Sequence, residues 1–127
     1  MPDDYYKPCA ELTRCNELIE RYWNAGDYEA CFQGHLELAK QGYPLAECQV
    51  GYFYLNGFGV AVDPEQGVLW TRRAAEHGDR DAQFNLGCCY EEGLGVAKDP
   101  KEAERWYRRA AAQGQREAIE KCAGRGS

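Results

Sequence analysis

The residues of this chain with the most varied chemistry are its seven cysteines and two histidines. Cys88 and Cys89 are adjacent, and adjacent positions of a helix point about 100° apart, so the two thiols are poorly placed to hold one metal ion. No C-x-x-C or H-x-x-x-H spacing occurs, and His35 and His77 are far apart in the sequence. We therefore expect no metal ion and no cofactor.

The number of cysteines bears on their redox state. An odd number leaves at least one thiol outside any set of internal disulfides. Cys15 and Cys31 could face one another across one helical hairpin, and a bridge between them would require an oxidising compartment. We expect most of the cysteines to be reduced and packed.

The patterns of nucleophilic catalysis are missing as well. Ser127 is the one serine and stands at the chain end, outside any S-x-x-K or G-x-S-x-G frame. Catalysis by a cysteine and a histidine would need His35 or His77 beside a thiol. We expect His35 on the second helix of a hairpin and His77 at a helix end, where histidines are usually surface or capping groups. Glu91 and Glu92 are typical of a solvated helix face. The sequence therefore predicts no enzymatic activity.

Two glycine-rich loops, GFGV from Gly57 and GLGV from Gly93, could approach a phosphate group. Neither matches a phosphate-binding motif, and each is followed by an acidic residue, Asp63 or Asp99, that would repel an anion. We expect both loops to be structural.

Paired arginines occupy equivalent positions at Arg72-Arg73 and Arg108-Arg109. They could form a basic stripe across stacked helices. Glu104 lies four residues before Arg108, and ion pairs at this spacing favour an ordinary solvent-exposed helix face.

Composition limits the class of partner. The chain has 127 residues, of which 44% are hydrophobic, enough for one folded domain. Its net charge is −6, and the acidic excess lies before Gly67, which argues against a nucleic-acid partner. We find no export signal and no apolar run of membrane-spanning length, so we expect a cytoplasmic location. Met1 and the polar ending AGRGS suggest a complete chain.

The elements that must position these residues are repeated. Gly57–Gly78 and Gly93–Gly114 carry nearly the same sequence at a period of 36 residues. In each copy an aspartate, Asp63 or Asp99, followed by proline is typical of a helix start, and Gly93 is typical of a helix end. Such a period predicts a solenoid of helical hairpins. We expect one domain, residues 1–127, with hairpins at about 10–42, 44–78 and 80–114 and a capping helix at 115–124.

Two stretches resemble the Sel-1-like repeat family, a relative of the tetratricopeptide repeats: AECQVGYFYLNGFGVAVDPEQGVLWTRRAAEHG and AQFNLGCCYEEGLGVAKDPKEAERWYRRAAAQG. The resemblance implies an all-α, right-handed superhelical solenoid of antiparallel helix pairs, and members that mostly work as adaptors holding other proteins. In the cysteine-rich branch of the family each repeat carries a disulfide. Its second cysteine falls at the repeat position that Ala75 and Ala111 occupy in this chain. The disulfides of that branch and its secreted character are therefore not carried over.

If the tetratricopeptide geometry applies, the first helices of the hairpins line a concave groove. The face expected to point into it carries both large apolar side chains and carboxylates, which suits a partner segment with apolar and basic residues. The expected groove residues are Glu20, Trp23, Asn24, Leu45, Cys48, Tyr52, Leu55, Asn56, Asp81, Phe84, Cys88, Glu91 and Glu92.

The sequence therefore predicts a non-catalytic adaptor or inhibitor that binds a peptide or helical segment of another protein, with no nucleic-acid or membrane partner. The alternative is a thiol-redox or hydrolytic enzyme of the cysteine-rich repeat type. A third interpretation is self-association, with a second copy filling the groove or an open end of the stack.

Overall fold

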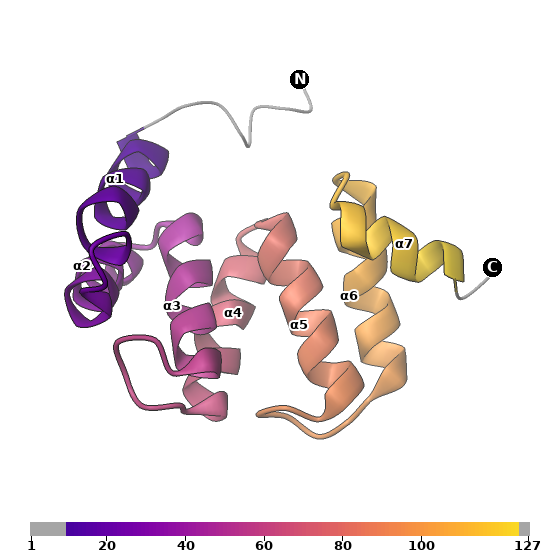
Figure 1. Ribbon diagram of the computed structural model, residues 1–127. Coiled ribbons are helices and arrows are strands. Elements are labelled where there is room, and N and C mark those ends of the chain that lie inside the picture. The colour runs from indigo at the N-terminus through magenta and orange to yellow at the C-terminus, as the bar shows by residue number, and fades with distance from the viewer. Residues whose placement is uncertain (1–9, 125–127) are drawn as a thin grey trace.

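The computed structural model describes residues 10–124, with side chains from Arg14 onward, so Met1, Cys9 and Ser127 lie outside the described part. Between residues 10 and 124 every regular element is helical, and Figure 1 shows the helices side by side in a row, from α1 and α2 at one end to α7 at the other. The elements are α1 (Ala10–Leu18), the π-helical turn η2 (Ile19–Trp23), α2 (Tyr28–Lys40), α3 (Pro44–Asn56), α4 (Pro64–Glu76), α5 (Arg80–Glu92), α6 (Pro100–Ala112) and α7 (Arg116–Gly124). The predicted all-α solenoid of helix pairs with a closing helix is confirmed.

The second helices of the hairpins begin where the sequence predicts. Asp63 and Asp99 each accept a hydrogen bond, 3.2 Å long, from the backbone N–H three residues later, which satisfies one of the free donors of α4 or α6. Gly93 ends α5 in the left-handed conformation, with φ of 71°, which glycine adopts without a steric penalty. These three predicted helix signals are confirmed.

An equivalent hydrogen bond closes the turn of each of the three hairpins. The N–H of the capping aspartate donates to the carbonyl of a tyrosine near the end of the preceding helix. The pairs are Asp27 with Tyr22 (2.8 Å), Asp63 with Tyr54 (2.9 Å) and Asp99 with Tyr90 (2.9 Å). The first turn is four residues shorter than the others, yet it is closed by the equivalent bond.

Close contacts join the two helices of each repeat. A Cβ placed on Gly51 would lie 2.9 Å from the carbonyl oxygen of Gly67, and one placed on Gly87 would lie 2.6 Å from the Tyr107 ring. Glycine at these positions lets α3 approach α4, and α5 approach α6, more closely than a side chain would allow. Buried apolar residues, including Val50, Phe53, Leu86 and Trp106, fill the space between neighbouring helices.

Equivalent polar pairs link the start of one helix to the end of another. Glu47, 3% exposed, accepts a hydrogen bond from Nδ1 of His77 at 2.7 Å. In the next repeat, 36 residues on, Nε2 of Gln113 donates to Oε1 of Gln83 at 2.9 Å. The same geometry is thus held by an acid and a histidine in one repeat and by two amides in the other.

Candidate functional site

Two adjoining hollows lie between α3 and α5, and together they form the candidate site, called the groove below. Tyr52 and Asn85 line both hollows, so the two are continuous. The first has a volume of about 210 Å³ and is lined by Leu45, Cys48, Gln49, Tyr52, Asp79, Asp81 and Asn85. The second has a volume of about 180 Å³ and is lined by Tyr52, Leu55, Asn56, Asn85, Cys88, Cys89, Glu92 and Leu94.

Tyr52 lies at the centre of the groove, and its position follows from the helix that carries it. The preceding residue, Gly51, is buried against α4, and the following one, Phe53, is buried in the core. Tyr52 itself remains 43% exposed, and its ring lies 5.9 Å from that of Phe58 in a nearly parallel stack. An aromatic ring supported on one side and open on the other is a good anchor for a bound side chain.

Eight of the thirteen residues expected in the groove line it. Five others line it without having been expected: Asp79, Cys89, Leu94 and the two amides Gln49 and Asn85. Both amides lie 36 residues apart, two positions before Gly51 and Gly87, respectively. The sequence holds a signal for these two amides. They occupy equivalent positions in two repeats, next to a repeat position already assigned to the groove.

The expected residues of the first hairpin lie apart from the groove. Glu20 lines a separate hollow of about 400 Å³ on α1 and η2. Trp23 packs in an aromatic cluster, with its ring stacked 5.6 Å from Phe53 and in edge contact with Phe58. Asn24 ends η2, where its N–H donates to the carbonyl of Ile19.

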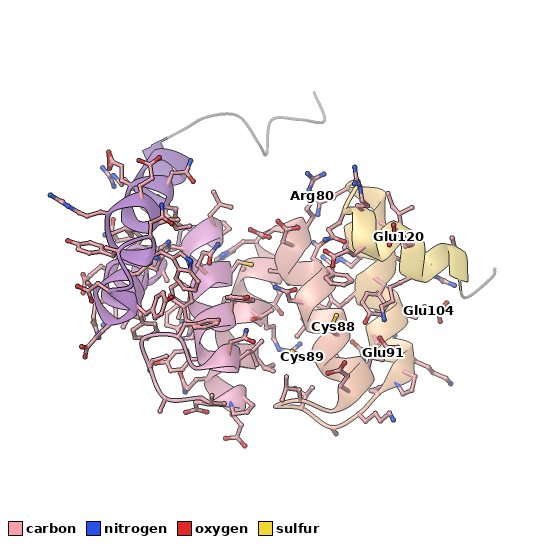
Figure 2. The ribbon with its side chains drawn as sticks, in the orientation of Figure 1. Arg80, Cys88, Cys89, Glu91, Glu104 and Glu120 are labelled. Carbon is pink, nitrogen blue, oxygen red and sulfur yellow. The ribbon has the colours of Figure 1, made fainter. Side chains whose placement is uncertain are left out.

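Phe84 and Glu91 contact α6 and α7. The Phe84 ring lies 5.6 Å from that of Tyr107, whose hydroxyl donates to Oε1 of Glu91. Lys121 of α7 reaches the same carboxylate oxygen at 3.2 Å. Burial, together with hydrogen bonds to Cys88 and Glu91, raises the pKa of Tyr107. Figure 2 shows Glu91 on α5 beside α6, so this network joins three helices at the end of the stack.

The groove is acidic. Among the described residues, its charged lining residues are Asp79, Asp81 and Glu92, and no lysine, arginine or histidine of this part of the chain lines either hollow. Asp79 is 1% exposed and caps α5 by accepting from the N–H of Ala82 at 2.9 Å. Asp81 and Glu92 are exposed, near the start and at the end of the same helix.

The three thiols of the groove are held in the protonated form. Burial, with smaller contributions from nearby Asp79 and Asp81, raises the pKa of Cys48 well above its usual value. Burial also raises the pKa of Cys88, and it raises the pKa of Cys89 to about 11. Because the thiolate is the reactive species, these cysteines are weak nucleophiles at neutral pH.

A cysteine and a histidine do meet in the first hairpin, although not at the surface. His35 lies on α2, the second helix of its hairpin, as expected, and it is fully buried, with its ring in edge contact with Phe53 of α3. Its Nδ1 lies 3.6 Å from Sγ of Cys31 and 2.9 Å from the Cys31 carbonyl oxygen. Burial lowers the pKa of His35 and raises that of Cys31, so neither is poised for catalysis. Cys31 carries a free thiol, so the bridge to Cys15 is not formed.

The arginine columns make local contacts. Arg108 pairs with Glu104 at 2.8 Å, as the spacing predicts. Arg73 lies over the Trp70 ring and Arg109 over the Trp106 ring, with 4.7 and 4.4 Å from guanidinium carbon to ring centroid.

The described stretch, residues 10–124, has neither a metal-ligand cluster nor a membrane-spanning helix. No three His, Cys, Asp or Glu side chains gather there as metal ligands, and no helix there has the length and hydropathy to span a membrane.

The sequence profile of the Sel1 repeat matches residues 44–79 and 80–115. Among curated proteins, chitin synthase regulatory factor 3 of Schizosaccharomyces pombe is 31% identical over 74 residues, which cover 58% of this chain and 8% of that protein.

Three solved structures share the fold. A Sel1 repeat protein from Oxalobacter formigenes is 39% identical with a TM-score of 0.76, over 87% of this chain and 44% of that one. A protective antigen of uropathogenic Escherichia coli with an SLR fold is 34% identical with a TM-score of 0.73, over 83% and 22%. Cysteine-rich protein B of Helicobacter pylori, 23% identical with a TM-score of 0.75 over 87% and 84%, shares the fold alone.

This chain spans less than half of the first two structures and a small part of the regulatory factor. The two matched repeats contain α3 to α6, and with them both helices that form the groove. The chain therefore belongs to the Sel1 repeat family.

Proposed function

We propose that this chain is a non-catalytic adaptor or inhibitor that binds a segment of another protein in the groove between α3 and α5. Sel1 repeat proteins generally mediate protein–protein interactions, and the family is typically a non-catalytic scaffold. The name of the yeast relative describes a regulatory factor, a role that a binding module would suit.

The observation that carries the proposal is the combination of an exposed aromatic ring with two adjoining hollows that it lines. Tyr52, 43% exposed, is shared by the two hollows, and Leu45 and Leu55 flank it along α3. Apolar side chains that remain accessible in a concave surface gain free energy when a partner covers them, at about 25 cal/mol per Å² of apolar area. Carboxylates around them select a partner by charge.

The pKa directions of the groove thiols favour binding over thiol chemistry. A redox or hydrolytic cysteine needs an accessible thiolate, usually next to a positive charge. Burial raises the pKa of Cys48, Cys88 and Cys89, and it outweighs the opposing charges of Lys121 near Cys88 and Arg72 near Cys89. No cation among the described residues lines either hollow. The groove is thus better suited to hold a partner than to react with one.

The experiment is a selection from a random peptide library displayed on phage, with the purified chain immobilised under reducing conditions. Enriched peptides are then titrated against wild type, Tyr52→Ala and Leu69→Ala by fluorescence polarisation. Leu69 of α4 is the matched control, because it is similarly exposed, at 40%, and lines neither hollow.

We expect Tyr52→Ala to weaken binding about tenfold or more, as removal of a central aromatic anchor does, and Leu69→Ala to leave it unchanged. Peptides that bind all three proteins equally would place the binding surface elsewhere and contradict the proposal. A dimer in light scattering that Tyr52→Ala dissociates would instead show that a second copy occupies the groove.

A further inference from the structure

The acidic side chains of the groove stand at its two ends. Asp81 belongs to the first turn of α5, and Glu92 is its last residue. Both are exposed, and between them lie the apolar side chains around Tyr52. The helix dipoles do not cancel either charge. The carboxylate of Asp81 outweighs a positive pole of about half a charge at a helix N-terminus, and the negative pole of α5 adds to Glu92.

The distance between the two ends sets the length of the occupant. Asp81 and Glu92 are 11 residues apart on one helix, which corresponds to about 16 Å along its axis. An extended chain rises about 3.1 to 3.4 Å per residue, so about five residues span this distance. A helical occupant would need about 11 residues to do the same.

The amides between the two ends favour an extended occupant. Gln49 and Asn85 are half-buried in the groove, and in the described part of the chain neither side chain has a hydrogen-bond partner. An extended backbone offers N–H and C=O groups that such amides can pair with, whereas a helix satisfies its backbone groups internally. Buried amides that stay unpaired in the complex would cost affinity.

We infer that the groove takes an extended segment of a partner protein in which two basic residues, four positions apart, flank a large apolar residue, with all three side chains on the same face of the segment. The apolar side chain lies against Tyr52, the basic side chains pair with Asp81 and Glu92, and the amides of Gln49 and Asn85 hold the intervening backbone. The inference rests on the proposed function and specifies its ligand.

The test uses three synthetic peptides in fluorescence polarisation at low and physiological salt. The first has two lysines four positions apart with a leucine midway, so that all three side chains lie on one face of an extended chain. The second has the same composition with the lysines adjacent, and the third has glycine in place of leucine. Adjacent lysines lie about 3.4 Å apart along an extended chain and cannot reach both carboxylates without strain.

We expect the first peptide to bind at least tenfold more tightly than either of the others, and more weakly as salt rises. Asp81→Asn and Glu92→Gln should each weaken it about threefold to fivefold, the scale of exposed ion pairs. A peptide that lacks one lysine should lose its sensitivity to one of these variants and keep the other, which assigns the direction of the chain in the groove.

Equal binding of the first two peptides, no binding of the first, or a helical conformation of the bound peptide in NMR spectra would overturn the inference. The library selection keeps this result separate from the proposed function. Enriched peptides that require Tyr52 but lack paired basic residues would overturn the inference and leave the function standing, whereas a library without any Tyr52-dependent binder would contradict the function itself.

Discussion

The substitution Gly51→Ala tests how closely α3 and α4 approach one another. In an open helix interior, alanine in place of glycine stabilises by up to about 1 kcal/mol. Here the added Cβ would meet the hydroxyl of Thr71 and lie 2.9 Å from the carbonyl oxygen of Gly67 and 3.0 Å from the backbone nitrogen of Thr71. The hydroxyl can rotate, but the backbone atoms move only if α4 shifts, and such overpacking costs about 1 to 3 kcal/mol.

We therefore expect Gly51→Ala to lower the free energy of unfolding by about 1 to 2 kcal/mol and the melting temperature by roughly 3 to 8 °C. The measurement is thermal and urea unfolding followed by circular dichroism at 222 nm. Gly34→Ala is the matched control, because the three atoms nearest to its Cβ would all belong to the flexible Leu18 side chain and none to a backbone, so it should be neutral or stabilising. If Gly51→Ala unfolds at or above the wild-type temperature, the close approach of the two helices is refuted.

Three further substitutions test individual contacts in urea unfolding. His77→Ala should lower the free energy of unfolding by about 1 to 3 kcal/mol, because it leaves the buried carboxylate of Glu47 without its hydrogen-bond donor. His77→Gln should restore much of the lost stability, and equal stability of the wild type and both variants would contradict this reasoning. Asp99→Ala should lower the free energy of unfolding by about 1 kcal/mol because the helix cap is lost, whereas Asp99→Asn should lower it little. An equally large loss of stability with asparagine would mean that the cap is not responsible. The Cys89 thiol has a pKa of about 11 in the folded chain against an ordinary value of 9. Its contribution to the free energy of unfolding is therefore complete below pH 9 and is lost as the pH rises toward 11. The stability difference between wild type and Cys89→Ala should therefore narrow between pH 8 and pH 11, and a constant difference would contradict the raised pKa.

The repeat pattern was enough to predict the fold, because each local signal agreed with the period. Asp63 and Asp99 cap their helices, and Gly93 ends its helix, as the residue types indicate. The face of α3 was also predictable: Tyr52 and Leu55 line the groove because they follow the buried Gly51 at helical spacing. Local chemistry and periodicity determine these features, and both can be seen in the sequence.

Features that depend on contacts between distant segments were not predictable in the same way. The π-helical turn that ends at Trp23 accompanies its stacking on Phe53, which belongs to a later repeat. Phe84 occupies a groove column, yet its ring lies against Tyr107 of the following helix. His35 is fully buried with its ring against Phe53 of α3, a contact that its position on one helix does not reveal. The position of a residue within the repeat predicts which face of its helix it lies on, but its contacts depend on the neighbouring helix.

The order of contacts along the stack has a consequence for the synthesis of this protein. Within residues 10–124 the helices pack chiefly on their neighbours in the chain, from α1 through to α7. Structure built from such local contacts forms quickly and does not wait for the far end of the chain. As the chain leaves the ribosome, each hairpin finds its packing partner in the hairpin already made, and Tyr52 meets the second wall of its groove only once α5 has emerged. The proposed binding surface is therefore completed late, after most of the scaffold that supports it.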